Sequence, residues 1–482
     1  MRFSLAALAF GALSLSACDS VSGPDSSTPQ AVTAAASVDA PTLEGRTDTP
    51  VARHMVSAQR LPADFEATVA SLGGTVAFTH STGFAIVDGL SDADAATLLG
   101  TRGIDEVVAD VVIERSPIDT QVEAVEAIPN APSDAFFYGL GYQWHMDAIS
   151  APTAWAAGRT GSSDVTVAVI DSGLDETHAD LAGLVDASRS VSFLAGDEFD
   201  YVIRDVLYPG APDYTDLNGH GTHVGATISS NGIVGAGVTE NVTLMAVKAC
   251  RYSNSCSGAA IIAGLLYAAD NGADVANMSL GGSFNKSDFP GYVGFLNQTF
   301  NYARRQGLTI VVSAGNSALD LDHDGDGYKT YCTTPATICV SATGPTATDD
   351  IRVGPFYNVD ALASYSNYGR SAINVAAPGG SGSGFVWAAC SSTGVVVQNG
   401  SIFRSGCSRS KTFITAKAGT SMAAPHVSGL AALLVEDYGR NPARIETRMQ
   451  QTADDLGQPG TDPAYGKGRI NVARALGLDV NV

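Results

Sequence analysis

Residues 165–173 read Val-Thr-Val-Ala-Val-Ile-Asp-Ser-Gly, and their pattern indicates the fold class. The first six residues form an apolar run typical of a strand that is buried on both faces of a parallel sheet. Four similar runs follow, with helical segments between them. This alternation predicts an α/β fold with a doubly wound, mostly parallel sheet over residues 134–482. The further strands are expected at 244–247, 275–278, 309–312 and 338–341, and the helices at 259–271 and 292–306.

Three segments carry residue types suited to acyl-transfer chemistry. The first strand delivers Asp171 to the carboxyl edge of the sheet, where open α/β sheets place functional groups. His220 opens an apolar helix in Asn-Gly-His-Gly-Thr-His-Val-Gly (218–225), and Ser421 lies in Gly-Thr-Ser-Met-Ala-Ala-Pro-His-Val-Ser-Gly (419–429). A carboxylate can orient an imidazole base, and a helix start offers free N–H groups to an oxyanion.

Taken singly, each segment has a simpler interpretation. The Asp-Ser-Gly tripeptide can cap a turn, and Ser421 can be the N-cap of a buried helix in the segment that runs into the helical stretch at 430–436. A histidine pair can bind metal or lie in the core, and for His223 one of these two interpretations is favoured over a catalytic role.

Together, the phrases around Asp171, His220 and Ser421 resemble the three signatures of the subtilisin-like serine proteases, in the chain order of subtilisin. The resemblance implies a secreted endopeptidase in which Ser421 is the nucleophile, His220 the general base and Asp171 the group that orients the base. Its substrates would be proteins or peptides, and catalysis would need no cofactor. The alternatives are a catalytically inactive cell-surface binding protein, a narrow processing peptidase and an esterase.

The same resemblance assigns the oxyanion donor and the substrate-binding backbone. Asn316, in Val-Ser-Ala-Gly-Asn (312–316), matches the asparagine that works with the backbone N–H of the nucleophile. Two segments match the backbone that flanks the primary specificity pocket and pairs with an extended peptide. They are Ser279, Leu280, Gly281 and Gly282, and Ser313, Ala314 and Gly315.

The N-terminus predicts export. Residues 1–17 have a basic start and an apolar run too short to span a membrane. The ending Leu-Ser-Ala-Cys (15–18) resembles the bacterial lipobox, which implies a lipid on Cys18 as the only membrane anchor; an ordinary secretory signal is the alternative. Residues 18–50 are rich in Ser, Thr, Ala, Pro and Asp, and a disordered tether is expected there. We expect an exported monomer, either a cell-envelope lipoprotein or an extracellular enzyme after processing.

Residues 51–115 predict a small ferredoxin-like α+β domain. Strand and helix patterns alternate as β-α-β-β-α-β, with strands at 51–56, 75–79, 83–87 and 107–113 and helices at 63–72 and 92–99. The phrases Leu-Gly-Gly-Thr-Val (72–76) and Gly-Phe-Ala-Ile-Val (83–87) resemble the inhibitor-type propeptide of the same proteases. We therefore expect a precursor that its own propeptide inhibits and that cuts itself in the proline-rich linker at 116–133.

Charge and cysteine content agree with export. Acidic residues number 49 against 27 basic ones, for a net charge of -22, which excludes nucleic acid as a partner. Apart from Cys18, the cysteines form three local pairs, and short loops favour three disulfides, although spacing alone allows other connectivities and free thiols. The expected pairs are Cys250 with Cys256, Cys332 with Cys339, and Cys390 with Cys407.

Two acidic clusters suggest structural calcium. Asp322, Asp324 and Asp326 occupy the first, third and fifth places of a calcium-loop pattern, but Thr333 stands where an EF-hand has glutamate, and a solvated acidic turn is the alternative. Many subtilisin-like proteases hold another calcium, for which Asp134 and Asp180 match two contributors. There the third contributor, near 229–234, is short. Residues 381–413 form an inserted segment with no assigned role.

Overall fold

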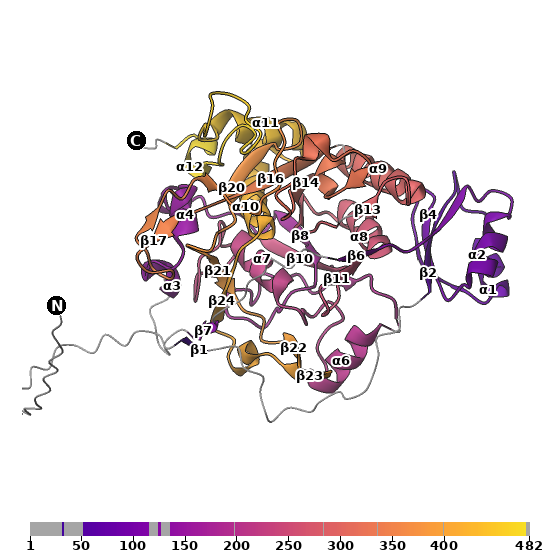
Figure 1. Cartoon of the computed structure of the whole chain (residues 1–482). Coiled ribbons are helices and arrows are strands. Elements are labelled where there is room, and N and C mark those ends of the chain that lie inside the picture. Colours follow the sequence, from indigo (N-terminus) through magenta and orange to yellow (C-terminus); the bar gives the residue numbers. More distant parts are fainter. Residues whose placement is uncertain are drawn as a thin grey trace, which may run out of the picture.

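The computed structural model describes residues 31–32, 52–114, 124–126 and 135–478, except 197, 283, 335 and 399. An eight-stranded sheet runs through the larger domain in the order β19-β16-β14-β12-β8-β10-β9, with β20 also paired to β16 (Figure 1). Every pairing is parallel except that of β19, which confirms the predicted fold class. The strands are β8 (Thr166–Asp171), β9 (Val191–Ser192), β10 (Thr243–Lys248), β12 (Val275–Met278), β14 (Thr309–Ser313), β16 (Thr337–Gly344), β19 (Ala361–Leu362) and β20 (Val375–Pro378).

Helices cover both faces of this sheet, and the alternation of side chains along β8 shows how. Val167 and Val169 pack in one core cluster with α7 (His220–Ile228) and α10 (Thr420–Tyr438). Ala168 and Ile170 point the other way, into a cluster with α8 (Gly258–Asp270) and α9 (Pro290–Arg305). Because both faces are buried, the strand reads as a continuous apolar run.

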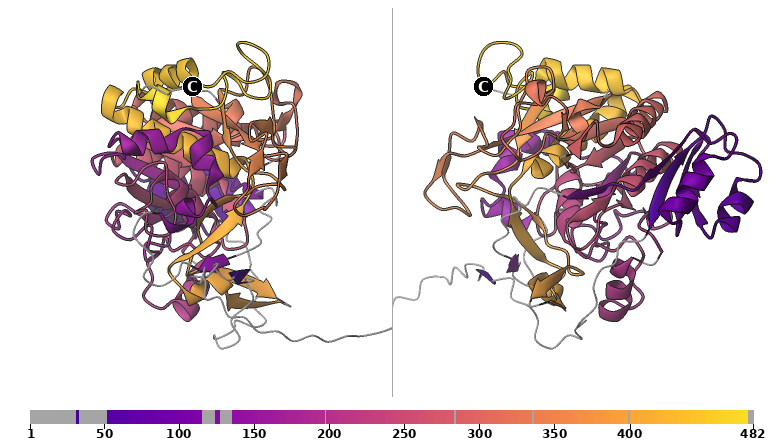
Figure 2. Two further views of the ribbon diagram at one scale, coloured as in Figure 1. Left: turned by 90° about the vertical axis from the view of Figure 1, so that its left-hand side faces the viewer. Right: turned by 45° about the vertical axis from the view of Figure 1, so that its right-hand side comes forward.

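The N-terminal domain projects from the side of the larger domain (Figures 1 and 2). Its antiparallel sheet has the order β3-β4-β2-β5 and packs beside α8 and α9. The expected last strand is divided, because the chain leaves the sheet after β5 and pairs in the larger domain as β6 (Val112–Glu114). The other elements are β2 (Arg53–Ser57), α1 (Phe65–Ser71), β3 (Thr75–Thr79), β4 (Phe84–Asp88), α2 (Asp92–Leu99) and β5 (Glu106–Ala109).

Two further segments lie together below the sheet in Figure 1. Helix α6 (Phe199–Leu207) packs through Phe199, Ile203 and Leu207 against Ile402 of a hairpin. That hairpin, β22 (Val395–Gln398) and β23 (Ser401–Arg404), belongs to the inserted segment 381–413, between β21 (Val386–Ala389) and β24 (Phe413–Lys417).

The remaining described elements are short, apart from α11. They are β1 (Ala31–Val32), β7 (Ala124–Glu126), α3 (Phe136–Gly139), α4 (Trp144–Ala148), α5 (Ala151–Ala156), β11 (Ser255–Ser257), β13 (Phe284–Asn285), η1 (Leu321–His323), β15 (Gly327–Tyr328), η2 (Tyr331–Thr333), β17 (Ala347–Thr348), β18 (Phe356–Tyr357), η3 (Gly406–Arg409), α11 (Pro442–Thr452) and α12 (Val472–Ala475). Within the described part of the chain, no helix has the length and apolarity needed to span a bilayer.

The three expected disulfides are confirmed: Cys250–Cys256, Cys332–Cys339 and Cys390–Cys407. The signal segment 1–17, Cys18, Asp134 and most of 18–50 and 116–133 lie outside the described residues.

Candidate active site

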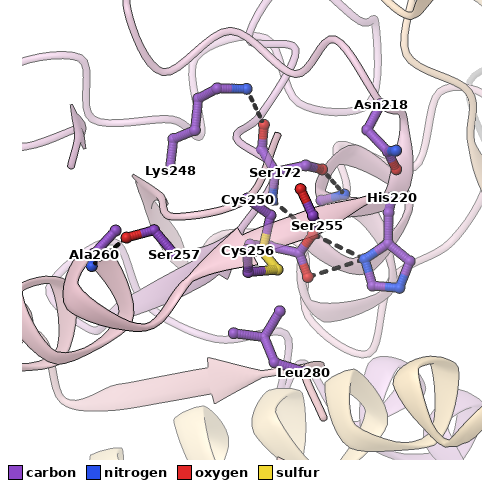
Figure 3. Close-up of a disulfide and its surroundings, with 12 residues drawn as sticks. Ser172, Asn218, His220, Lys248, Cys250, Ser255, Cys256, Ser257, Ala260 and Leu280 are labelled. Atoms are coloured by element: carbon purple, nitrogen blue, oxygen red, sulfur yellow. Dashed lines mark hydrogen bonds and ion pairs between the residues drawn. A yellow bond between two sulfur atoms is a disulfide. The ribbon is translucent and has the colours of Figure 1, made fainter. Parts of the chain in front are cut away.

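Asp171 and His220 meet at the carboxyl edge of the central sheet. Asp171 ends β8, and His220 begins α7. Nδ1 of His220 lies 2.8 and 2.9 Å from the two carboxylate oxygens of Asp171, and both side chains are buried. With Nδ1 facing the carboxylate, Nε2 is the ring nitrogen that remains for proton transfer. Figure 3 shows His220 near Ser172 and the Cys250–Cys256 disulfide.

Two glycines allow this close approach of strand and helix. A Cβ at Gly173 would lie 2.1 Å from the carbonyl oxygen of Tyr214. A Cβ at Gly221 would lie 2.1 Å from the carbonyl oxygen of Gly173. Because backbone atoms cannot yield as a flexible side chain does, only glycine fits at these two positions. The glycines of the two motifs therefore set the distance between Asp171 and His220.

Asp216, which the sequence analysis did not single out, organises the start of α7. Its buried carboxylate accepts hydrogen bonds from the backbone N–H groups of Asn218, Gly219 and Thr222, at 3.0, 2.8 and 2.8 Å. It also accepts from the Ser172 hydroxyl at 2.8 Å, next to Asp171. These bonds satisfy N–H groups that a helix start otherwise leaves unpaired. An Asp four residues ahead of a helix-initiating His was the signal for this role.

Lys248, at the end of β10, contacts the backbone next to Asp171. Its Nζ donates to the carbonyl oxygen of Ser172, at 2.8 Å (Figure 3). It also donates to the carbonyl oxygen of Thr215, at 3.2 Å. It also lies 3.2 Å from the Asp200 carboxylate, and both charged side chains are 1% exposed. Burial raises the pKa of Asp200. Helix α6, which carries Asp200, is thereby tied to the residue that follows Asp171.

Ser421 is the second residue of α10, which packs against α7. Its Oγ lies 3.3 Å from the carbonyl oxygen of Ser279, and its own carbonyl accepts from the Ser279 hydroxyl at 2.7 Å. That carbonyl is available because Pro425, four residues on, has no N–H to donate to it. Asn277 connects Ser279 with Ser428 at 2.9 and 2.8 Å. These contacts hold the start of α10 against β12.

The helix itself begins earlier than expected. The expectation placed a helical stretch at 430–436, whereas α10 runs from Thr420 to Tyr438 and contains Pro425. The residues from Thr420 to Val435 are buried, so packing maintains the helix across the proline.

Asn316 lies beside Ser421 with its amide oriented. Its Oδ1 accepts from the N–H and the hydroxyl of Thr420, both at 2.8 Å. A Cβ at Gly419 would lie 3.4 Å from Asn316 Nδ2 and 3.7 Å from the Ser421 backbone nitrogen. Two N–H donors therefore border the same small space above Gly419, as an oxyanion site requires.

The two expected substrate-binding segments end neighbouring strands. Ser279, Leu280, Gly281 and Gly282 follow β12, and Ser313 ends β14, followed by Ala314 and Gly315. The Ser313 hydroxyl lies 3.3 Å from the Leu280 carbonyl, and Asn367 donates to the Ala314 carbonyl at 2.8 Å. The Gly315 N–H bonds to Thr420 Oγ1 at 3.0 Å. The two segments are thus fixed to each other and to the start of α10.

The segment that leaves the N-terminal domain enters this region. Strand β6 pairs antiparallel with β11, and a Cβ at Gly282 would lie 2.3 Å from Ile113 Cγ2. Before it, Asp110 accepts from the Ala259 N–H at 2.7 Å and the Ser257 hydroxyl at 2.5 Å, at the start of α8. Burial raises the pKa of Asp110. Strand β6 of the chain itself therefore lies against Gly282, in one of the segments that were expected to bind substrate.

The calcium assignments do not fit the residues as placed. Asp322 accepts from Ser371, and Asp326 from Ser287, while Asp324 lies 3.6 Å from the Lys286 ammonium, so the three carboxylates do not converge. The described residues contain no group of three or more His, Cys, Asp or Glu side chains able to hold a metal ion.

The other expected calcium ligand, Asp180, has different partners. Its carboxylate accepts from the backbone N–H groups of Ile233, Val234 and Gly235, at 3.2, 2.7 and 3.0 Å. The short loop presents donors to Asp180, where a cation would need oxygen ligands. In the same core, His223 is buried and its Nε2 lies 3.1 Å from the Val386 carbonyl, as the core interpretation expects.

A buried Asp–His pair at the edge of a parallel sheet, with a serine opening the neighbouring helix, is typical of serine hydrolases. The sequence profile of the subtilase family (Peptidase S8) matches residues 162–468. Thermophilic serine proteinase from Bacillus sp. (strain AK1) is 33% identical over 348 residues, covering 72% of this chain and 69% of the relative. Thermitase from Thermoactinomyces vulgaris is 30% identical over 348 residues, covering 72% of this chain and 99% of the relative.

A solved structure shares the fold. The epidermin leader peptide processing serine protease from Staphylococcus aureus superimposes with a TM-score of 0.67 at 19% identity, covering 89% of this chain and 98% of that one. The chain belongs to the subtilase family, and it is a subtilisin-type serine endopeptidase.

Proposed function

We propose that Ser421, His220 and Asp171 cleave peptide bonds as nucleophile, general base and orienting carboxylate. The observation that carries this assignment is the contact of both Asp171 oxygens with His220 Nδ1, at 2.8 and 2.9 Å. The carboxylate fixes the tautomer with the proton on Nδ1 and stabilises the imidazolium that forms. In this assignment Nε2 is the ring nitrogen that exchanges the proton with Ser421.

The reaction follows from these roles. Nε2 of His220 takes the proton from Ser421 Oγ as Oγ attacks the carbonyl carbon of the substrate. The tetrahedral intermediate collapses when His220 returns that proton to the leaving amine, and an acyl-enzyme remains. Water, deprotonated by His220, attacks the acyl carbon and releases the carboxylic acid product. The negative oxygen of each intermediate is stabilised by Asn316 Nδ2 and the Ser421 N–H, which border the same space.

The N-terminal domain acts as an inhibitory propeptide that the enzyme removes itself. Two contacts support this. On one side of the site, strand β6 pairs with strand β11 and places Ile113 against Gly282. Strand β7 pairs antiparallel with β24, which leads to Ser421, on the other side. Residues 115–123 join the two strands, so the cut falls between Glu114 and Ala124, a narrower window than the linker pattern indicated.

Export is part of the same proposal. Three disulfides are expected in an oxidising compartment. The lipobox-like residues before Cys18 support cleavage of the signal and lipid attachment at that sulfur. Replacement Cys18→Ser should abolish labelling by fatty acid and release the protein from membranes; retained labelling would contradict the anchor.

Precursor processing tests the catalytic assignment. Purified Ser421→Ala precursor should stay full length and hydrolyse no casein, because no nucleophile is present. Ser428→Ala, in the same helix, serves as the matched control and should process, since the Ser428 hydroxyl donates to Asn277 in the support of β12 and takes no part in the proposed reaction. Processing of the Ser421→Ala precursor at the normal rate would contradict self-cleavage.

A further inference from the structure

A solvent-open cavity of about 470 Å³ lies between the inserted hairpin and the segment that follows α6. Among the described residues that line it, three are basic and none is acidic, in a chain whose net charge is -22. Hydroxyl groups and one aromatic ring complete the wall. The basic residues are Arg404, Arg409 and Lys411, and they are joined by Ser392, Ser408 and Tyr208.

Contacts with neighbouring residues hold the side chains that line the cavity. The Arg404 guanidinium lies 4.9 Å from the centre of the Tyr208 ring and contacts the Leu207 carbonyl. The Tyr208 hydroxyl donates to the Gly394 carbonyl at 2.9 Å. Cys390 is bonded to Cys407, which closes the loop that carries Arg404. Arg404 Nε is buried and has no hydrogen-bond partner among the described residues.

The cavity connects to the candidate active site through two elements. Ser392 donates its N–H and hydroxyl to Asp175, at 2.7 and 2.6 Å, in the loop that follows Asp171. Lys411 lies two residues ahead of β24, and β24 leads to the helix that begins with Thr420. The candidate nucleophile therefore follows the C-terminal end of β24, and the cavity lies at the N-terminal end of the same strand.

The pairing of β7 with β24 gives the direction of a bound chain. Ala124 lies opposite Thr415 and Glu126 opposite Phe413, so the chain moves away from Ser421 as it runs toward its C-terminus. Because β7 follows the proposed cut, β24 binds the leaving-group side of a substrate. A peptide continuing in this direction reaches the basic residues beyond Phe413.

We propose that this cavity is a subsite for acidic side chains of a peptide substrate, on the C-terminal side of the scissile bond. The inference rests on the proposed function of Ser421 and deepens it. Arginine and lysine bind carboxylates through charge-assisted hydrogen bonds. On a strongly acidic protein, most of the surface repels such a peptide, and the cavity is a local exception that selects both partner and direction.

The first test compares cleavage of two quenched fluorescent peptides. They differ only in carrying Glu or Gln at the positions on the C-terminal side of the residues that pair with β24. The mature enzyme should show a kcat/KM about three- to tenfold higher for the Glu peptide at low salt, and the ratio should fall toward one at about 0.5 M salt. Arg409→Gln with Lys411→Gln should abolish the preference and leave cleavage of the Gln peptide unchanged. The control Arg305→Gln with Arg444→Gln, which neutralises exposed cations of α9 and α11, should retain it. A preference that is absent from the wild type, or retained without Arg409 and Lys411, overturns the proposal.

The second test does not depend on catalysis. Fluorescence anisotropy measures binding of the labelled leaving-group half of the Glu peptide to enzyme inactivated by a fluorophosphonate, or to untreated protein if no label is incorporated. Binding should weaken about three- to tenfold in the Arg409→Gln, Lys411→Gln variant. Binding without any hydrolysis would sink the catalytic assignment but support the subsite, whereas hydrolysis without selective binding would do the reverse. Displacement by inorganic phosphate beyond that by chloride at equal ionic strength would indicate a small-anion site and overturn the peptide proposal.

Discussion

At the carboxyl edge of β8, Asp171 is 0% and His220 1% exposed, whereas Val397 in the hairpin β22–β23 is 57% exposed. The first region is closed by backbone contacts that tolerate only glycine and by hydrogen bonds to Asp216. The second is held by one small apolar cluster, the Cys390–Cys407 disulfide and contacts of Arg404. The difference indicates that a change in the first region disturbs fold and chemistry together, while a change in the second leaves the chemistry intact and alters the hairpin and substrate recognition.

The largest effect is expected from Gly221→Ala. Its Cβ would lie 2.1 Å from the Gly173 carbonyl oxygen, so strand β8 and helix α7 must separate. We expect little folded, processed enzyme in expression trials followed by circular dichroism. Gly294→Ala in α9 is the matched control, because a Cβ there meets nothing within 4 Å, and alanine should change stability by no more than about 1 kcal/mol. Normal folding of Gly221→Ala would refute the role given to this contact.

A smaller loss is expected from Lys248→Met, which probes the link between the two regions. It leaves the Asp200 carboxylate buried without its cation, and the free energy of unfolding should fall by about 3–5 kcal/mol in urea denaturation. The double variant Lys248→Met, Asp200→Leu should recover most of this loss but keep a reduced kcat, because the Ser172 carbonyl still lacks its donor. Equal kcat in the double variant and the wild type would show that Lys248 does not position Asp171.

Removal of single disulfides separates the regions further. Cys390→Ser with Cys407→Ser should cost about 3 kcal/mol of hairpin stability, measured by limited proteolysis, and leave kcat on short peptides unchanged. Cys250→Ser with Cys256→Ser should instead raise KM, since Cys256 lies in β11, the strand that pairs with β6 beside the candidate active site. Equal KM for the two variants would contradict the division.

Acid sensitivity is the smallest effect and belongs to the first region. His145 and His426 lie 2.8 Å apart in the core, and burial lowers the pKa of His426 to about 4. Burial, together with His426 and His223, lowers the pKa of His145 well below 6.5. The unfolded chain binds protons below about 6.5 and the folded chain does not, so stability is complete above that pH and declines toward pH 4. His145→Gln should move the midpoint of acid unfolding down by about half a pH unit; an unmoved midpoint would exclude His145 as a contributor.

Local patterns predicted much of the first region. The strand at 165–170 and the helix starting at His220 depend on residues close in sequence, and the structure has them. The three disulfide pairs, one of which lies in the second region, are local in the same way. Pro425 favours a break in a helix. The continuation of α10 across it depends on contacts between residues distant in sequence, namely the burial of the helix and the hydrogen bond from the Ser279 hydroxyl to the Ser421 carbonyl.

The second region was beyond sequence reasoning for a different reason. Which acid meets Lys248 depends on how α6 packs against β10. Which aromatic ring lies under Arg404 depends on how the segment after α6 packs against the inserted hairpin. The Asp322 loop shows the opposite error, because a pattern of carboxylates predicted convergence that the hydrogen bonds to Ser371 and Ser287 prevent.

The assignment of Ser421 as the nucleophile is tested most directly by mapping the residue that a fluorophosphonate modifies in the processed enzyme. Peptide mapping by mass spectrometry should find the adduct on Ser421, and His220→Ala precursor cleaved by an added protease should react at least ~10³-fold more slowly. An adduct on another serine, or undiminished labelling without His220, would contradict the assignment of Ser421, His220 and Asp171.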